Sequence, residues 1–325
     1  MLEFIKPGLE TSVQDFPGRI GFWSLGIPPS GPMDALSFQL TNVAAGNAPG
    51  DPGLEVQFIG PEIRFQADTV VAVGGADMKP KVNGQLIPGW EGVPVSTGDV
   101  LTFGFAAQGC RSYVAVAGGV DIPRVMGSCS TFVKANIGGI GGGAAKAGTV
   151  LKTSPSVRPL AECSGRRIVD AARPAFGASW EVEVLLGPHD DWLTDADINQ
   201  FTSFEWKVSS LSDRTGYRIE GPDFEFGHKA HNKLPENGSD PSNIIDFGYS
   251  VGSVNFCGQT PIILMVDGPS LGGFVNPFTV LSTSLWKLGQ AKPGDHVRFK
   301  VVTEEEARAL RADFKAAVSE QSVTR

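Results

Sequence analysis

The residues best suited to chemistry follow one short apolar run in the last third of the chain. The run covers residues 262–266, and Asp267, Ser270, Gly272 and Gly273 come directly after it. A carboxylate in that position could accept N–H bonds or take a proton, and the glycines would let backbone N–H groups approach a ligand. The local alternative is a Gly/Pro loop in which Asp267 only closes an Asx-turn.

The element that must position these residues is a buried strand. Turn signals bound the run on both sides, with residues 258–261 in front and residues 267–269 behind. A short apolar run between turn signals is typical of a fully buried strand. Upstream, Val254 and Phe256 flank Asn255 and indicate a second strand, so we expect the two strands to form a hairpin.

Further polar residues crowd the stretch from 237 to 290. Ser242, Asn243, Asp246 and Tyr249 all precede the hairpin. The first two could simply form a turn, and Tyr249 could be a core residue. Their density favours a small-molecule pocket, in which they would orient a substrate.

A second candidate region lies near the N-terminus, in the loop that contains Ser30 and Asp34. Asp34 can cap a helix, because Leu36, Leu40 and Val43 follow it at helical spacing. The helix should end near residues 46–47. Asp34 is therefore either a helix cap or a site residue.

Residues 54–117 predict successive short strands, and Asn83-Gly84 is a strong hairpin turn signal. This spacing favours an antiparallel barrel or sandwich over a fold of alternating strands and helices. Three short motifs recur in the second half of the chain, which indicates a duplicated β-module. They pair residues 55–65 with 220–226, residues 97–103 with 293–299, and the strand-loop near 112–123 with that near 262–273.

The domain boundaries follow from composition. We expect an N-terminal β-barrel subdomain over residues 1–160, a linker over 161–180, and a C-terminal β-barrel subdomain over 181–325 that ends in a helix from about residue 304.

The glycine-rich residues 138–143 lack the register and context of a nucleotide-binding loop. A flexible loop is the better interpretation, and such a loop could cover a site as a lid.

Composition excludes several classes of protein. With 325 residues, 41% hydrophobic and 19% charged, the chain is globular, and its 41 glycines and 23 prolines favour strands and turns. A net charge of −8 argues against a nucleic-acid binder. We expect no membrane span, no secretion signal and no metal site, and the four scattered cysteines indicate free thiols in the cytoplasm.

Long peptides of the chain resemble a known family. In the second half these are SDPSNIIDFGY, VNFCGQTPIIL, DGPSLGGF and LWKLGQAKPGDHVRF, and in the first half SVQDFPGRIGFWSLGIPPSGPMD, SYVAVAGGVDIP and MGSCST. They look like the carboxyltransferase region of urea carboxylase. More broadly, the chain is similar to the family called KipA, allophanate hydrolase subunit 2 or biotin-dependent carboxyltransferase.

The resemblance implies a mainly β fold of two linked cyclophilin-like antiparallel β-barrel subdomains with a few short helices. It also implies a cytoplasmic enzyme component that transfers a carboxyl group from carboxybiotin to urea, guanidine or a urea-like amide. Biotin would sit on a separate carrier and not on this chain. The implied partners are a KipI-like subunit (resembling allophanate hydrolase subunit 1), the biotin carrier and a biotin carboxylase.

Within that hypothesis we assign the site residues as follows. Catalytic roles go to Asp267, Asn255 and Ser270, and substrate-binding roles to Ser242, Asn243, Asp246, Tyr249, Gly272, Gly273, Ser30 and Asp34. The chemistry requires deprotonation of the acceptor nitrogen, donors for developing charge, and close positioning of both reactants.

Two other functions stay open. The chain also resembles the KipA-like subunit of bacterial ATP-dependent 5-oxoprolinase, an amidohydrolase that does not use biotin. Alternatively, it is a non-enzymatic module that binds a KipI-like regulator. The sequence has no carrier motif for biotin, because Met78-Lys79 is followed by Pro80.

Overall fold

The computed structural model describes residues 1–325, which form two compact units. The first unit contains Met1–Ile20, Ser30–Phe176 and Asp313–Arg325, and the second contains Gly21–Pro29 and Gly177–Ala312. The boundary at residues 176–177 falls inside the expected linker. The first part of that linker is not extended chain, however, because a short helix, a two-residue strand and a 3-10 turn occupy it.

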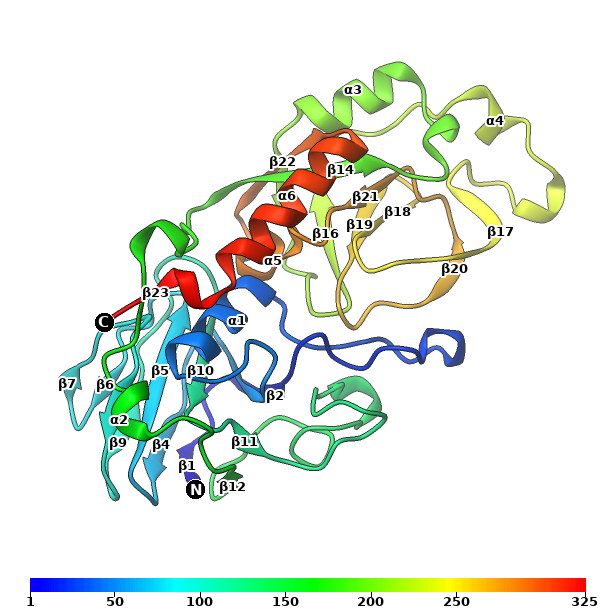
Figure 1. Cartoon of the computed structure of the whole chain (residues 1–325). Helices are drawn as coiled ribbons and strands as arrows, with labels where there is room; N and C mark the ends of the chain where they lie inside the picture. The colour runs from blue at the N-terminus through cyan, green and yellow to red at the C-terminus, as the bar shows by residue number, and fades with distance from the viewer. The chain divides into compact units, whose positions relative to one another are not determined.

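Two antiparallel sheets build the first unit (Figure 1). One sheet has the strand order β11-β12-β1-β4-β9-β6-β7, and the other has the order β2-β3-β10-β5-β8. Their bounds are β1 Leu2–Lys6, β2 Glu10–Gln14, β3 Gly53–Gln57, β4 Glu62–Phe65, β5 Thr69–Gly75, β6 Lys81–Val82, β7 Gln85–Leu86, β8 Val93–Val95, β9 Val100–Thr102, β10 Arg111–Val116, β11 Val120–Asp121 and β12 Val150–Thr153.

Both sheets contribute to one apolar core in this unit. Phe4 and Phe65 come from the first sheet, and Val56, Val73 and Val114 come from the second. Alternate strand residues point to opposite faces, so each sheet presents one apolar row to the other. The succession of short strands that the sequence predicts over residues 54–117 is present as β3 to β10.

Helix α1 (Ala35–Ala44) packs on β5 and β10 of the first unit. It begins at Asp34, whose carboxylate accepts the N–H of Ser37 at 2.8 Å, and it is followed by Gly46 at a positive φ. The predicted cap, apolar stripe and end of this helix are confirmed.

The unit's other short elements are α2 Leu160–Cys163, β13 Arg167–Ile168, η2 Val133–Ala135, η3 Asp170–Ala172, η6 Glu320–Ser322 and β23 Val323–Thr324.

A closed barrel forms the second unit, with the strand order β14-β21-β18-β19-β16-β15-β22. All neighbours pair antiparallel except β14 and β22, which run parallel. The strands are β14 Ser179–Leu186, β15 Trp206–Val208, β16 Gly216–Glu220, β18 Ser253–Cys257, β19 Thr260–Leu264, β21 Phe278–Val280 and β22 His296–Val301. The predicted hairpin is β18–β19, in which Val254 pairs with Ile263.

Aromatic side chains fill this barrel. Phe201, on helix α3 (Asp195–Ser203), stacks on Phe278 at 4.1 Å and on Phe299 at 4.4 Å between ring centroids. Phe256 and Trp206 lie in the same fully buried cluster. Helix α3 therefore closes the barrel interior with one aromatic side chain.

A two-stranded ribbon of β17 (Asn243–Gly248) and β20 (Leu271–Phe274) forms a separate small sheet in the second unit (Figure 1). The remaining elements of this unit are η1 Trp23–Leu25, η4 Asp190–Trp192, α4 His228–His231, η5 Pro235–Asn237 and α5 Leu285–Gln290. The predicted terminal helix is α6, Glu304–Ala317.

The prediction of a mainly β chain with short helices is confirmed. The proposed repeat holds for residues 97–103 and 293–299, which both lead from a turn into a strand, β9 and β22. It does not hold for residues 220–226. The N-terminal segment of that match contains strand β4, whereas the chain after Glu220 forms no strand.

None of the helices has both the length and the apolar character that a membrane crossing requires.

Replacing Phe201 tests the importance of the barrel plug. Phe201→Ala should lower the free energy of unfolding by about 3–5 kcal/mol, because it leaves a cavity among stacked rings. Phe201→Leu fills more of that space and should cost clearly less. Thermal unfolding followed by circular dichroism measures both. Equal midpoints for the alanine variant and the unmodified chain would contradict the plug role.

Candidate functional site

Strand β18 has one apolar face and one polar face. Val254 and Phe256 are fully buried in the barrel core, whereas Ser253 and Asn255 point to the opposite side. That opposite side is also buried, since Asn255 is only 4% exposed. The predicted site residue Asn255 therefore lies on the outer wall of the barrel and is covered by neighbouring parts of the chain.

The side-chain oxygen of Asn255 has no hydrogen-bond donor within the protein. This Oδ1 atom is enclosed, so solvent does not supply one either. The great majority of buried side-chain polar atoms in proteins have a partner, so an orphaned amide oxygen points to a group that binds there.

Asn276 supplies a second orphaned oxygen beside the first. The N–H of Phe256 donates to the Val275 carbonyl at 3.1 Å, which places the 275–276 segment alongside β18. The Nδ2 group of Asn276 donates to Ser253 Oγ at 3.0 Å. Its Oδ1 atom is enclosed without a donor, and the side chain is 3% exposed.

His189 lies against the same segment. The backbone N–H of Asn276 donates to Nδ1 of His189 at 3.2 Å, and the imidazole meets the ring of Phe247 at 4.6 Å. Burial, together with the positive charge of Lys229, lowers the pKa of His189 below its ordinary value of 6.5. The ring is therefore neutral at pH 7, and its proton is on Nε2 because Nδ1 accepts.

Asp267 forms a buried ion pair with Arg214. The guanidinium donates from Nε to Oδ2 at 2.8 Å and from Nη2 to Oδ1 at 3.3 Å. The backbone N–H of Asp267 also donates to the Arg214 carbonyl at 2.9 Å. Both carboxylate oxygens are thus engaged, and Asp267 makes no hydrogen bond to Gly272 or Gly273. Asp267 would therefore act on a ligand through Arg214 and not by direct contact.

The ribbon side of the site is held together by Tyr249. Its hydroxyl donates to the Phe274 carbonyl at 2.9 Å and accepts the Phe274 N–H at 2.7 Å. Its backbone N–H donates to the carbonyl of Ser270 at 2.8 Å. Burial raises the pKa of Tyr249, so the phenol stays protonated at neutral pH.

The two ribbon glycines are required for close packing. A Cβ on Gly272 would lie 2.8 Å from the Tyr249 ring, and one on Gly273 would lie 3.0 Å from the Ile244 carbonyl. These glycines let the backbone of β20 approach Tyr249 and β17 without a clash.

Ser242 and Asn243 lie in a structured turn. Ser242 donates from N and Oγ to Asp240 and accepts the N–H of Gly258 at 2.9 Å. Asn243 starts β17, where its carbonyl accepts from Lys233. Asp246 is exposed on the same strand. These residues surround the end of the ribbon.

Ser30 and Asp34 belong to the first unit. Ser30 is buried in the left-handed region (φ 55°), and its Oγ has no partner. Asp34 is fully buried as the cap of α1, and its N–H donates to the hydroxyl of Tyr113 at 2.8 Å. Tyr113 in turn donates to Glu55 at 2.9 Å, and burial followed by the charge of Glu55 raises its pKa well above the ordinary value.

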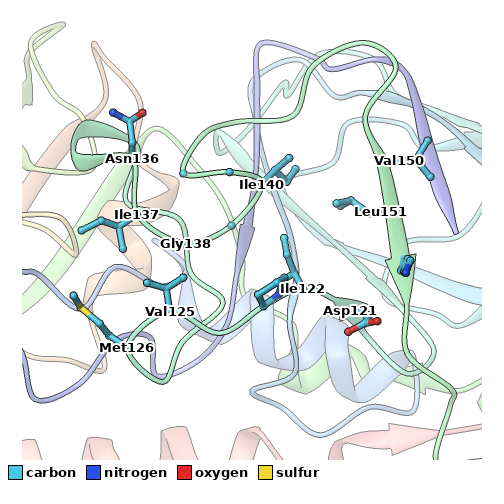
Figure 2. Close-up of a pocket in the computed structure, with 15 residues that line it drawn as sticks. Asp121, Ile122, Val125, Met126, Asn136, Ile137, Gly138, Ile140, Val150 and Leu151 are labelled. Atoms are coloured by element: carbon cyan, nitrogen blue, oxygen red, sulfur yellow. The ribbon is translucent and has the colours of Figure 1, made fainter.

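The glycine-rich loop 138–143 forms compact turns in the first unit. The N–H of Gly142 donates to the Gly138 carbonyl at 2.7 Å, and that of Gly139 to Cys129 at 3.1 Å. The loop lines an open groove of about 850 Å³ (Figure 2). Its other walls are mostly apolar side chains: Ile122, Val125, Met126, Ile137, Val150 and Leu151. None of the predicted site residues lines this groove.

Comparison with known proteins decides the family. The model described as "Carboxyltransferase domain, subdomain A and B" matches residues 25–301. The chain belongs to this carboxyltransferase family. The resemblance to the KipA-like family and to urea carboxylase is thereby confirmed.

Relatives of the chain fall into two groups. It is 40% identical over 322 residues to urea amidolyase of Saccharomyces cerevisiae, covering 98% of this chain and 17% of that protein. It is 32% identical over 315 residues to a 5-oxoprolinase subunit of Escherichia coli, covering 96% and 95%. The crystal structure of Kluyveromyces lactis urea carboxylase matches with a TM-score of 0.92 at 38% identity, covering 100% of this chain and 30% of that one.

The chain therefore spans less than a third of the urea amidolyase and urea carboxylase that it matches.

Three residues of the second-unit site were not in the sequence-based assignment: Arg214, Asn276 and His189. Arg214 carried a weak signal, since residues 213–214 resemble a pair typical of the family. Nothing in the local sequence distinguishes Asn276 or His189.

The ion pair of Asp267 yields a stability prediction. Asp267→Asn removes the charged partner of Arg214 from a buried ion pair, so the free energy of unfolding should fall by about 3 kcal/mol. Arg214→Lys keeps the charge but loses the forked geometry and should cost less. Thermal unfolding of the three chains provides the comparison. An unchanged midpoint for Asp267→Asn would show that the pair is not maintained.

His189 yields a pH prediction. Its folded pKa lies below the unfolded value of 6.5, so its contribution to stability is complete above pH 6.5. That contribution should be lost as the pH falls through 6.5 toward the folded pKa. His189→Asn should therefore show a smaller drop in thermal midpoint between about pH 8 and about pH 5. His228→Asn, at an exposed histidine, is the control, and a curve like that of His189→Asn would refute the assignment.

Proposed function

We propose that this chain is the carboxyltransferase component of a biotin-dependent urea carboxylase, acting on urea or a urea-like amide such as guanidine. The observation that supports this most is the 40% identity to urea amidolyase across 98% of the chain, against 32% to the 5-oxoprolinase subunit. The TM-score of 0.92 to Kluyveromyces lactis urea carboxylase supports the same choice.

The reaction forms one bond from the acceptor nitrogen to the carboxyl carbon and breaks one bond from the same carbon to the donor nitrogen. Carboxybiotin on a separate carrier supplies the carboxyl group. The acceptor nitrogen loses a proton, and the released donor nitrogen gains one, so atoms and charge balance. This chain's task is to hold the acceptor, exclude water and place charge near the reacting nitrogen.

The polar wall beside β18 suits a ligand of this chemistry. Asn255 Oδ1 and Asn276 Oδ1 are enclosed acceptors that lack donors, and urea, amides and the ureido ring of biotin all carry N–H groups. The buried ion pair of Arg214 and Asp267 lies in the same unit. The N–H of Tyr249 donates to the Ser270 carbonyl and joins the end of β17 to the start of β20.

We further propose that the chain works with a KipI-like subunit, a biotin carrier and a biotin carboxylase. The relatives support this, because this chain corresponds to only part of urea amidolyase. We place the reaction in the cytoplasm, since all four cysteines are free thiols.

A second function has its own support. The chain covers 95% of the Escherichia coli 5-oxoprolinase subunit, a match over nearly the full length of both proteins. In that role the same polar wall would receive a cyclic amide, and biotin would not take part.

Reconstitution separates these functions. The chain, mixed with a KipI-like protein, a biotinylated carrier and a biotin carboxylase, should consume ATP and bicarbonate when urea is added, and 5-oxoproline should not replace urea. Omitting the biotinylated carrier should abolish turnover. Asp267→Asn removes the carboxylate that holds Arg214 and should lower turnover by about two to four orders of magnitude at a temperature where the variant is still folded. Turnover of 5-oxoproline without the carrier would instead identify the chain as part of an oxoprolinase.

A further inference from the structure

The first unit holds a pocket of about 340 Å³ at the end of strand β5, a volume in the usual range for small-molecule sites. Three segments line the pocket: the end of β5 with the residues after it (73–77, 79 and 80), the chain from β7 onward (86, 87, 89 and 90), and Arg173. None of these residues is among the site residues assigned from the sequence.

The pocket forms because β5 is only partly covered on one edge. Strand β8 pairs with β5 at residues 69–71, so the last part of β5 has no strand beside it on that edge. Trp90 lies there instead: its N–H donates to the Val73 carbonyl at 2.7 Å, and its own carbonyl accepts the N–H of Ile168 at 2.9 Å. The backbone of Trp90 is therefore held on both sides.

Trp90 gives the pocket a flat apolar wall. Its backbone lies in the left-handed region (φ 63°), which a bulky residue rarely adopts and which concentrates at functional sites. A Cβ on Gly74 would lie 2.8 Å from Cε3 and Cζ3 of the indole, so the ring packs directly on bare backbone. The half-buried Trp90 lines the pocket together with Leu86 and Ile87. A planar apolar group can stack on such a wall.

Arg173 brings a fixed positive charge to the pocket. Its Nε and Nη2 groups donate to the Ile168 carbonyl at 2.9 and 2.6 Å, which holds the guanidinium in one orientation. The other three N–H groups make no hydrogen bond within the protein, although Nη1 lies 3.0 Å from the Asp170 carboxylate. The side chain of Asp170 is 79% exposed and also meets Arg167, so this ion pair is weak and an incoming anion can compete with it.

Lys79 adds a second positive charge, on an exposed side chain. Its ammonium group pairs with Asp77, and its backbone N–H donates to the same carboxylate at 2.8 Å. An ammonium group has three N–H donors, so two remain for a ligand. The charged side chains that line the pocket are thus two cations and one anion, which favours an anionic ligand.

We propose that this pocket, here called the Trp90 pocket, binds a small planar carboxylate, such as an aromatic or heteroaromatic acid. The ring of the ligand lies on the indole, and its carboxylate meets the guanidinium of Arg173 and the ammonium of Lys79. Arginine suits this role because its planar N–H groups match both oxygens of a carboxylate. Such binding is independent of carboxyl transfer, since no residue of the Trp90 pocket belongs to the assigned site.

The first test compares three ligands on the full chain by saturation-transfer NMR. Benzoate should bind saturably, with a Kd of about 1 mM or tighter. Benzyl alcohol keeps the ring without the charge, and cyclohexanecarboxylate keeps the charge without the flat ring, so each should bind at least about threefold more weakly. No saturable binding of benzoate, or an equal affinity for either analogue, would overturn the proposal.

The second test locates the ligand through fluorescence. Benzoate that stacks on the indole should change the emission of Trp90, one of the six tryptophans of the chain. Trp90→Phe keeps a flat ring, so binding measured by NMR should persist while the change in emission disappears. The same change in emission with Trp90→Phe would place benzoate elsewhere and overturn the proposal.

The third test changes the charges one at a time, after thermal unfolding has shown that each variant is folded. Arg173→Lys keeps the charge but loses the planar N–H groups, so benzoate should bind about tenfold more weakly. Arg167→Lys is the matched control, because Arg167 meets the same Asp170 but does not line the pocket. Lys79→Gln, at an exposed position, should weaken binding by about threefold.

Asp170→Asn should instead strengthen binding. The substitution removes the carboxylate that competes for Arg173, so the affinity for benzoate should rise by about threefold. Unchanged affinity in Arg173→Lys or Lys79→Gln would overturn the proposal. Weaker binding in Asp170→Asn, or an equal loss in Arg167→Lys and Arg173→Lys, would do the same.

Discussion

The alternation of side chains along β18 is the constraint on which the second unit depends. Val254 and Phe256 enter the aromatic core, so the register of the strand is fixed by the burial of large apolar groups. A slip of one residue would place Asn255 among stacked rings and move Phe256 to the polar side of the strand, which is far too costly to occur. Because the core fixes the inner face, the outer face holds its polar atoms in place even though they make few bonds of their own.

Buried carboxylates and hydroxyls also hold polar groups in place where the chain has no regular structure. In the first unit, Asp15 accepts from the hydroxyls of Ser128 and Ser130 and from the N–H of Cys129, and Glu55 accepts the N–H of Met33. These acceptors replace the ladder bonds that a strand would supply. The loop carrying the candidate residues Ser30 and Asp34 is therefore rigidly attached to the sheet, which suits a surface that must present polar groups in fixed positions.

Local signals in the sequence were sufficient for much of the fold. Turn residues and alternation predicted the β18–β19 hairpin and the Asn83-Gly84 turn, and capping with helical spacing predicted α1. The site was only partly predictable, because its contacts join distant residues: His189 is 87 positions from Asn276, and Arg214 is 53 positions from Asp267. The residue type also does not show whether the hydrogen-bonding groups of a side chain are already bonded to other parts of the protein. Tyr249 and Asn255 looked equally suited to binding, yet the Tyr249 hydroxyl is fully used by Phe274.

The first unit is completed by the last stretch of chain. Residues 313–325 belong to it, β23 pairs with β13, and Glu320 bridges Arg158 and Arg166. During synthesis on the ribosome, residues 177–312 emerge before this stretch does. The barrel of the second unit thus has nearly all of its chain available while β13 still waits for its partner strand, which reverses the usual order in which domains fold from the N-terminus. A released chain that ends at residue 312 would hold every strand of the barrel and would leave β13 of the first unit without its partner strand.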